Sequence, residues 1–326
     1  MPTKPIASLS LDLDNKWTYL KTHGDAGWQS FPSYLSIVVP RFLNFLKQRD
    51  LALTVFIVGQ DAALEQNRET LAAIAADGHE IGNHSFHHDP WLHLYTEEEI
   101  EEDLGTSEEA IEKATGQVPI GFRGPGYSCS QATLRTLARR GYSYDASTFP
   151  TFLGPLARAY YFMTSNLSKE DREQRKILFG TFRDGFRPIK PFQWHMPTGD
   201  LLEIPVTTIP FFKTPFHVSY ILYLSSFSRR LALSYFRTAL WLCRMTGTPP
   251  SILLHPLDFL GCDDVQDLSF FPAMNLPGER KLDLIDKALC MLTSQFNVVP
   301  MQEQARQAVR IPNNLPLIEP SFLLSS

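Results

Sequence analysis

Two carboxylates and a group of histidines are the residues of this sequence with the clearest capacity for chemistry. Asp12 and Asp14 end an alternating segment, so their side chains are expected on the same side of a strand. His84 and His88 are four residues apart, and one turn of helix would put both imidazoles on one face at metal-ligand spacing. An aspartate with two histidines leaves a coordination position for water, which is typical of catalytic metal ions. His87 is a rival ligand, three residues after His84.

These residues also have structural explanations. Aspartates that follow a strand often cap a local turn, and histidines often satisfy hydrogen bonds in a core or on a surface. However, two carboxylates at the same end of a sheet repel each other, which is unfavourable unless a cation or an arginine lies between them. The combination of the aspartate pair with the histidine pair therefore favours a metal site over either structural explanation.

Two further segments supply groups for acid–base and oxyanion chemistry. Arg123 precedes Gly-Pro-Gly and Tyr127, and an arginine here is able to neutralise and orient a carboxylate. The glycines allow close approach of the backbone to a ligand and can aim an N–H at a developing oxyanion, although most such tripeptides are simply turns. His255 ends the apolar run 252–254 and is a candidate general acid.

The segments that must position these groups alternate between strand-like and helix-like patterns. Such alternation indicates a parallel α/β sheet, closed or open, with its active site at the carboxyl ends of the strands. The expected strands cover 6–13, 53–58, 79–83, 120–123, the region near 144, 201–206 and 251–255, and the expected helices cover 34–48, 61–76, 96–114, 131–140 and 280–294.

Composition excludes several classes of protein. The 326 residues carry a net charge of −5, and the pI near 6.0 gives no electrostatic footprint for nucleic acid. Four scattered cysteines do not make a disulfide scaffold. The first ten residues lack the apolar segment of a signal peptide, so we expect a cytoplasmic location. The sequence gives no indication of the oligomeric state.

Aromatic residues provide the remaining clues to a substrate. Trp17, Tyr19 and Trp28 follow Asp14, and such rings either stack on a sugar or pack in the interior. The apolar stretch 214–228 precedes three arginines and is too short for a spanning helix. It predicts either two buried or groove-lining helices or a peripheral contact with a membrane or a lipid-linked substrate.

At these residues the chain resembles the polysaccharide deacetylase family, the NodB-homology group of carbohydrate esterase family 4. Five segments carry the resemblance in order: Ser-Leu-Asp-Leu-Asp at 10–14, His-Ser-Phe-His-His at 84–88, Arg-Gly-Pro-Gly-Tyr at 123–127, Asp145 with Phe149, and Leu-Leu-His at 253–255. The first segment has D-x-D where most members have adjacent aspartates, a variant similar to the branch of cytoplasmic deacetylases and lipid-linked aminoarabinose deformylases. Phe149 stands where the family usually has tryptophan, so the wall of the site beside His255 is expected to differ from that of most members.

The resemblance implies a role for each matching residue. It implies Asp12 as base, oriented by Arg123, and His255 as acid, tuned by Asp145. The Tyr127 backbone N–H is implied as the oxyanion donor. The implied metal ligands are Asp14, His84 and His88.

The implied fold is an irregular (β/α)7-type barrel in one domain at 1–310, with helical and aromatic insertions at about 150–200 and 207–249, and a tail at 311–326. The implied activity is metal-dependent removal of an N-acetyl or N-formyl group from an amino sugar or from an intracellular or lipid-linked glycan precursor. Zinc is the expected ion, and cobalt or nickel suit the same ligands. Trp17, Tyr19, Trp28 and Phe149 are the expected substrate-binding residues. The alternatives are a metal-free allantoinase-like amidohydrolase acting on a ureide and a sugar-binding pseudoenzyme.

Overall fold

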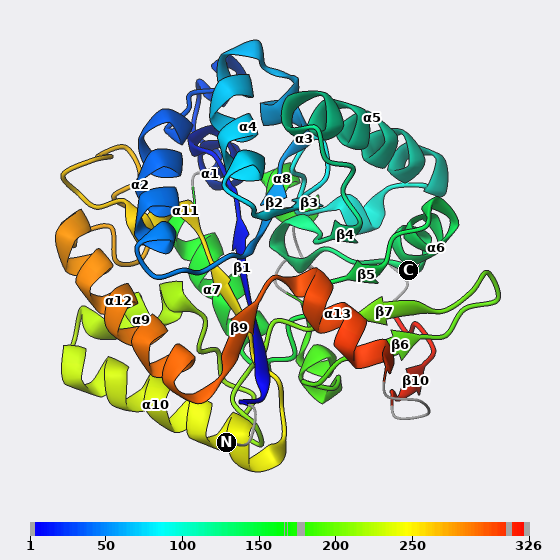
Figure 1. Cartoon of the computed structure of the whole chain (residues 1–326). Helices are drawn as coiled ribbons and strands as arrows, with labels where there is room; N and C mark the ends of the chain where they lie inside the picture. Colours follow the sequence, from blue (N-terminus) through cyan, green and yellow to red (C-terminus); the bar gives the residue numbers. More distant parts are fainter. Residues whose placement is uncertain (1–3, 166, 168, 175–179, 311–314, 323–326) are drawn as a thin grey trace.

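A ring of parallel strands forms the centre of the molecule, and helices surround it (Figure 1). The computed structural model describes residues 4–165, 167, 169–174, 180–310 and 315–322. The ring strands are β1 (Ile6–Asp12), β2 (Thr54–Ile57), β3 (Glu80–Asn83), β4 (Gly121–Phe122), β5 (Tyr144–Asp145), β7 (Leu201–Glu203) and β8 (Ser251–Leu254). Neighbours in the order β8-β1-β2-β3-β4-β5-β7 pair in parallel.

The chain that follows β7 closes this ring. The N–H of Val206 donates to the carbonyl of Thr148 at 2.9 Å, and the N–H of Thr207 donates to Ser251 at 3.1 Å. The first bond joins this segment to the chain just after β5, and the second joins it to the start of β8. The expected irregular (β/α)7-type barrel is thus confirmed.

Helices cover the outside of the barrel and its two ends. They are α1 (Lys16–His23), α2 (Leu35–Lys47), α3 (Gly59–Ala63), α4 (Arg68–Ala76), α5 (Glu97–Thr115), α6 (Gln131–Arg140), α7 (Gly154–Thr164), α8 (Lys169–Gln174), α9 (Val218–Ser225), α10 (Arg229–Thr246), α11 (Pro256–Phe259), α12 (Gly278–Gln295) and α13 (Met301–Arg310). Their sequences explain several of the ends: Thr96 and Glu99 form the predicted capping box of α5, and Gly116 ends that helix at φ 73°.

Three short strands lie outside the ring. They are β6 (Phe192–Trp194), β9 (Asn297–Val299) and β10 (Leu317–Ile318). β9 pairs with β1, β6 runs antiparallel to β7, and β10 pairs with β6. The predicted tail therefore contributes a strand to the sheet, whereas residues 311–314 and 323–326 of that tail lie outside the described residues.

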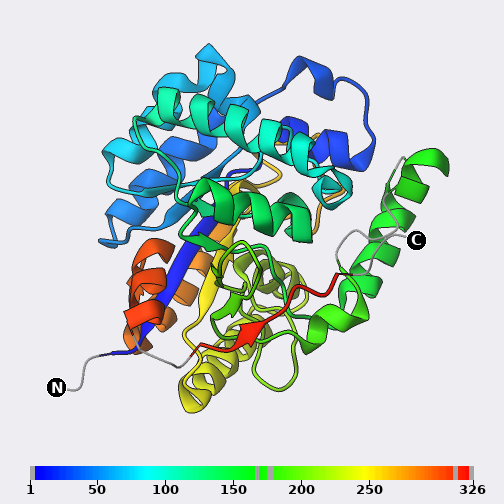
Figure 2. The same ribbon diagram turned by 90° about the vertical axis from the view of Figure 1, so that its right-hand side faces the viewer.

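The insertions predicted near 150–200 and 207–249 differ in structure. The first contains α7, α8 and β6, and α7 projects from the body of the molecule (Figure 2). The second contains α9 and α10, which pack against the barrel and α12. In the described part of the chain, no helix has the length and apolar character required to cross a membrane.

The helix predicted at 61–76 is not continuous in the structure. Residues 61–76 form the end of α3, a short 3₁₀ segment at Glu65–Asn67 and then α4. Asn67 explains part of the break, because its side-chain amide donates to the backbone carbonyl of Asp61 at 3.0 Å and to its carboxylate.

Candidate active site

The carboxyl end of β1 meets the loop after β3, and the predicted metal ligands come together there. The Nε2 atom of His88 lies 2.9 Å from Oδ1 of Asp14, and the Nε2 atom of His84 lies 3.3 Å from the same oxygen. One ligand atom from each of the three residues lies within 4.8 Å of the other two. The structure therefore places an aspartate and two histidines in one group, as the sequence predicted.

The predicted helical turn between the two histidines is wrong. Residues 84–88 form a loop in which Ser85 and His88 have positive φ values of 61° and 51°. The loop is held by Asp103 of α5, whose carboxylate accepts the N–H groups of Phe86 and His87. These bonds turn the backbone so that His84 and His88 converge, while His87 is exposed.

A neighbouring backbone group fixes the orientation of His84. Its Nδ1 lies 2.6 Å from the carbonyl of Arg123, which can only accept, so Nδ1 carries a proton and Nε2 is directed at Asp14. Such a second hydrogen bond commonly orients a metal-ligating histidine. Burial opposes ionisation of Asp14, but His88 and His84 outweigh it and hold the Asp14 pKa well below its ordinary value. A divalent cation fits this set of one carboxylate and two imidazoles.

Asp12 lies beside this group in a buried ion pair. The Nη1 atom of Arg123 lies 2.6 Å from Oδ1 of Asp12, and the guanidinium is fully buried. Arg123 also donates to the hydroxyl of Ser10 and the carbonyl of Ala146. The guanidinium is thus held from three sides and orients the Asp12 carboxylate.

The segment Arg123–Tyr127 forms a tight turn after β4. A Cβ atom on Gly124 would lie 1.9 Å from the carbonyl oxygen of Ser128, so only glycine fits. Tyr127 has φ 63°, and its N–H donates to the carbonyl of Gly124 at 3.0 Å. The predicted oxyanion role of this N–H would require that bond to open.

Asp145 is linked to this turn through Ser147. Among the described residues, no hydrogen bond joins Asp145 to His255. Its carboxylate accepts from the Ser147 hydroxyl at 2.5 Å, and the same hydroxyl accepts from the N–H of Gly124. Burial and the neighbouring Glu203 raise the Asp145 pKa well above its ordinary value. The structure therefore connects Asp145 to the turn through Ser147, and its role in tuning His255 stays a prediction.

His255 follows β8 and lies at the strand end next to Asp12, because Leu254 pairs with Leu11. Its Nδ1 lies 2.9 Å from the hydroxyl of Ser219 on α9, and its N–H donates to Asp258. Ser219 also bonds to Asp258, whose pKa is raised because burial outweighs the effect of His255 and these hydrogen bonds.

Phe149 connects this histidine to the Arg123–Tyr127 turn. Its ring stacks on Tyr127 with centroids 4.7 Å apart and meets the edge of His217 at 5.8 Å. His217 in turn lies 6.1 Å from His255, centroid to centroid. Burial, with a smaller effect of His255, lowers the pKa of His217 to about 3. Phe149 thus lies between Tyr127 and His217, and its contact with a substrate stays a prediction.

Two of the predicted sugar-binding rings are buried. Trp17 is 1% exposed, and its Nε1 donates to Asp61 at 3.0 Å. Tyr19 is 8% exposed and packs edge-on against Phe271. Neither ring has a free face for a sugar, so the prediction is wrong for both. Trp28 is half-buried and remains at the rim, stacked on Trp17.

Sequence reasoning missed three residues that shape the site. They are Asp103, which shapes the histidine loop; Ser219, which contacts His255; and Asp61, which supports the loop after Asp14. Asp61 follows the carboxyl end of β2 and so carried a detectable signal. Asp103 lies within an acidic run and Ser219 within an apolar segment, and neither pattern distinguishes them.

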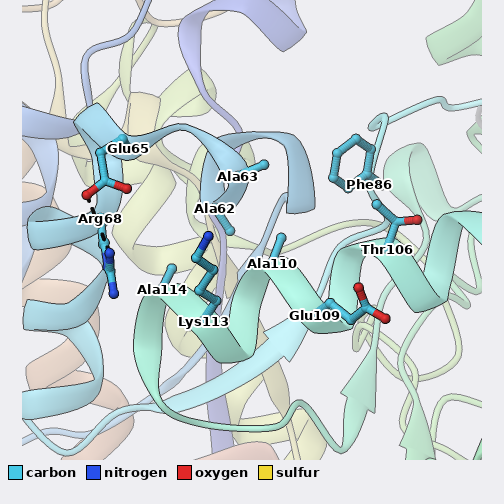
Figure 3. Close-up of a pocket in the computed structure, with 10 residues that line it drawn as sticks. All are labelled: Ala62, Ala63, Glu65, Arg68, Phe86, Thr106, Glu109, Ala110, Lys113 and Ala114. Carbon is cyan, nitrogen blue, oxygen red and sulfur yellow. Dashed lines mark hydrogen bonds and ion pairs between the residues drawn. The ribbon is translucent and has the colours of Figure 1, made fainter.

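A separate pocket lies away from these groups, between α3 and α5 (Figure 3). Its volume is about 270 Å³, and none of the predicted site residues lines it. Arg68 and Lys113 are accompanied there by Glu65 and Glu109, so the pocket has no dominant charge.

Comparisons with known proteins agree with this arrangement. Residues 23–144 match the family model described as polysaccharide deacetylase. A peptidoglycan deacetylase of Helicobacter pylori is 28% identical over 154 residues, which are 45% of this chain and 50% of that protein. A peptidoglycan-N-acetylmuramic acid deacetylase of Bacillus subtilis is 33% identical over 104 residues, or 32% of this chain and 38% of that protein. The chain thus spans at most half the length of these two relatives.

A solved structure extends the likeness of fold to nearly the whole chain. The match is a Mycobacterium smegmatis protein provisionally named a polysaccharide deacetylase, with a TM-score of 0.63 at 20% identity, covering 99% of this chain and 97% of that one. At this identity the match is evidence for the fold alone. The family model and the curated relatives thus place residues 23–144 in the polysaccharide deacetylase family, and this structure extends the likeness of fold to the rest of the chain.

Proposed function

We propose that this protein is a metal-dependent hydrolase that removes an N-acetyl or N-formyl group from an amino sugar. The observation that carries the proposal is the grouping of Asp14, His84 and His88 within 4.8 Å, beside the ion-paired Asp12. This grouping weighs against a metal-free amidohydrolase, because such an enzyme has no use for three converging ligands. Zinc is the ion that we propose, although cobalt and nickel accept the same ligands.

The surrounding residues provide the groups that amide hydrolysis needs. A divalent ion bound by the three ligands would supply Lewis acidity and lower the pKa of water. Asp12, oriented by Arg123, accepts the proton of the water that attacks the acyl carbon. His255 then donates a proton to the nitrogen as the carbon–nitrogen bond breaks, which yields a free amine and acetate or formate.

Ser219 and Asp258 support the proposed acid. The hydroxyl of Ser219 fixes Nδ1 of His255, which leaves Nε2 for the leaving nitrogen. Asp258 fixes the backbone of the same residue through its N–H. We therefore assign Ser219 as a positioning residue for His255.

The proposed substrate is an N-acylated sugar in a precursor, either intracellular or lipid-linked. Names of the relatives point to N-acetylated glycans, since two of them are peptidoglycan deacetylases. The cytoplasmic location, which stays a prediction, favours such a precursor. The exposed apolar side chains of α9 and α10 also favour it. Phe149 and Trp28 are the remaining aromatic candidates for contact with the sugar.

A single assay tests the activity. The purified protein is incubated with N-acetylated and N-formylated amino sugars, free and lipid-linked, and the release of acetate and formate is measured. We expect release that a chelator abolishes and added zinc restores. Full activity in chelator, or no release from any acylated sugar by metal-loaded protein, would contradict the proposal.

A further inference from the structure

The helices of the second insertion present an unusual surface to solvent. We propose that the α9–α10 face docks on an anionic lipid bilayer. We define this face as the exposed apolar side chains Tyr223, Phe227, Leu231, Trp241 and Met245 with the arginines Arg230, Arg237 and Arg244.

The charge of this part of the chain supports an anionic partner. Residues 204–257 contain five basic residues and no aspartate or glutamate, although the whole chain has a net charge of −5. Arg229 is paired with Asp283, and Arg244 donates to the carbonyl of Gln295. Among the described residues, no carboxylate forms an ion pair with Arg230 or Arg237. These two charges remain available to a lipid phosphate.

The spacing along α10 arranges the charged and apolar groups in parallel rows. Arg230, Arg237 and Arg244 recur every seven residues, close to two helical turns, so they form one row along the helix. Trp241 and Met245 lie beside that row and are 54% and 66% exposed. An arginine row bordered by an aromatic and aliphatic row is typical of a helix that lies in a membrane interface.

Aromatic contacts extend this face across α9. The rings of Tyr235 and Tyr220 lie 5.9 Å apart, Tyr220 and Tyr223 lie 6.4 Å apart, and Tyr223 meets Phe227 at 5.3 Å. Phe227 is 73% exposed. Tyrosine and tryptophan favour the level of the lipid headgroups, because their rings are apolar and their polar atoms reach water.

A hairpin next to these aromatic residues adds two more exposed rings. Its ends pair at Thr208 and Pro215, and Tyr235 donates to the carbonyl of Pro215 at 2.7 Å. Phe211 and Phe212 are 76% and 67% exposed at its tip. Phe211 has φ 71°, a conformation that is unfavourable for a bulky residue.

The rest of the molecule would orient this face toward a negative surface. The helix α5 carries nine acidic residues and one lysine, and it lies on the opposite side of the barrel from α10 (Figures 1 and 2). Three of these acidic residues, Glu97, Glu101 and Glu108, pair with arginines of α6, and the others leave this side negative. An anionic bilayer would therefore repel one side and attract the other. Because α9 also supplies Ser219, docking would bring the His255 side of the site toward the lipid headgroups.

Vesicle binding tests the proposal without depending on the proposed hydrolysis. The full chain is co-sedimented with vesicles of phosphatidylcholine and with vesicles that contain an equal amount of phosphatidylglycerol. We expect binding to the anionic vesicles only, and weaker binding at high salt. Arg230→Gln with Arg237→Gln should weaken binding about fivefold for each arginine. The matched control Lys47→Gln with Arg68→Gln removes two exposed charges from α2 and α4 and should bind like the wild type.

Specific results would overturn the proposal. They are failure to bind anionic vesicles, equal binding to both kinds of vesicle, and equal loss of binding in the control. A dimer in solution that Trp241→Ser dissolves would assign the face to a second copy of the chain instead. Release of acetate or formate from a free acylated sugar should be unchanged in Arg230→Gln/Arg237→Gln. The acyl-release assay and the vesicle-binding assay therefore test the proposed hydrolysis and the proposed docking independently.

Discussion

The two sides of the candidate site are built in different ways. The metal side comprises Asp12, Asp14, the two histidines and Arg123, which come from β1, the end of β3 and the end of β4. Buried hydrogen bonds join these parts directly, since Arg123 contacts Asp12 through its side chain and His84 through its carbonyl. The position of each group is therefore fixed by at least one other group of the same side.

The acid side is assembled from more distant parts of the chain. His255 follows β8, whereas its partner Ser219 comes from α9 in the second insertion. Phe149 and His217 complete this side through ring contacts. No hydrogen bond among the described residues joins the side chains of His255 or Ser219 to the metal side. The two sides meet where β8 pairs with β1, and Phe149 stacks on Tyr127 in the turn after Arg123. The metal side is thus set by the barrel, and the acid side depends on the insertion.

Loss of a metal ligand is the change with the largest expected effect on turnover. His88→Ala removes one of the three candidate ligands, and we expect the purified variant to retain no metal and to show no measurable deacylation. Metal content and acyl release are measured on the same sample. His87→Ala is the matched control, because His87 is exposed, its bonds to Asp103 and Lys21 are made by its backbone, and its ring contacts Phe86 rather than Asp14. Metal loss in His87→Ala with full metal in His88→Ala would reverse the assignment of the ligands.

Removal of the proposed base or acid should have the next largest effect. Asp12→Asn and His255→Ala are each expected to lower kcat by about 10²–10⁴-fold, the range for positioned acid–base groups, while metal content stays unchanged. The two variants separate the contributions of the metal side and the acid side, because each removes a group from one side and leaves the metal ligands in place. Near wild-type turnover in either metal-loaded variant would show that its side chain has another role.

The metal side is the more predictable of the two. Its residues form short motifs at the ends of recognisable strands, so their spacing predicts a metal site of an aspartate and two histidines, and the family resemblance implies Asp14, His84 and His88 as the ligands. The predicted helical turn is wrong because the loop depends on Asp103, which is separated from it in sequence and meets it only in the fold. Residue type and position are therefore predictable here, whereas local geometry is decided by a tertiary contact.

The acid side is predictable only in part. His255 stands out as a histidine at the end of an apolar strand, but its partner lies 36 residues earlier, in a segment whose pattern indicates an apolar helix. The prediction for Trp17 and Tyr19 is wrong for a related reason. Burial of an aromatic ring depends on what covers it, and Asp61 and Phe271 lie far from these rings in sequence.

Ser219→Ala tests whether the insertion positions the acid. The variant loses one hydrogen bond to His255, worth about 1 kcal/mol, so kcat should fall about fivefold with KM unchanged. Ser219→Thr keeps the hydroxyl and should restore kcat. The control is Ser225→Ala on the same helix, whose hydroxyl bonds only to the carbonyl of Leu222. A rise in KM without a change in kcat would instead place Ser219 in substrate binding.

Asp61→Asn should have the smallest effect on turnover and a clear effect on the pH dependence of stability. Burial raises the pKa of Asp61 from 3.8 to about 7, against the bonds from Asn15 and Trp17. The folded state therefore holds a proton that the unfolded state releases, and this contribution to stability is complete below about pH 4 and is lost as the pH rises to about 7.

Asparagine at this position keeps an oxygen for Asn15 and Trp17 and carries no charge to bury. At pH values above about 7 the variant should be more stable than the wild type by about 4 kcal/mol, and the difference should shrink toward about pH 4. Urea unfolding across this range measures it, with exposed Asp50→Asn as the control. Unchanged turnover would show that the metal side tolerates loss of a supporting charge because its own bonds already fix it. Parallel stability curves for variant and wild type would mean that Asp61 titrates alike in the folded and unfolded chain.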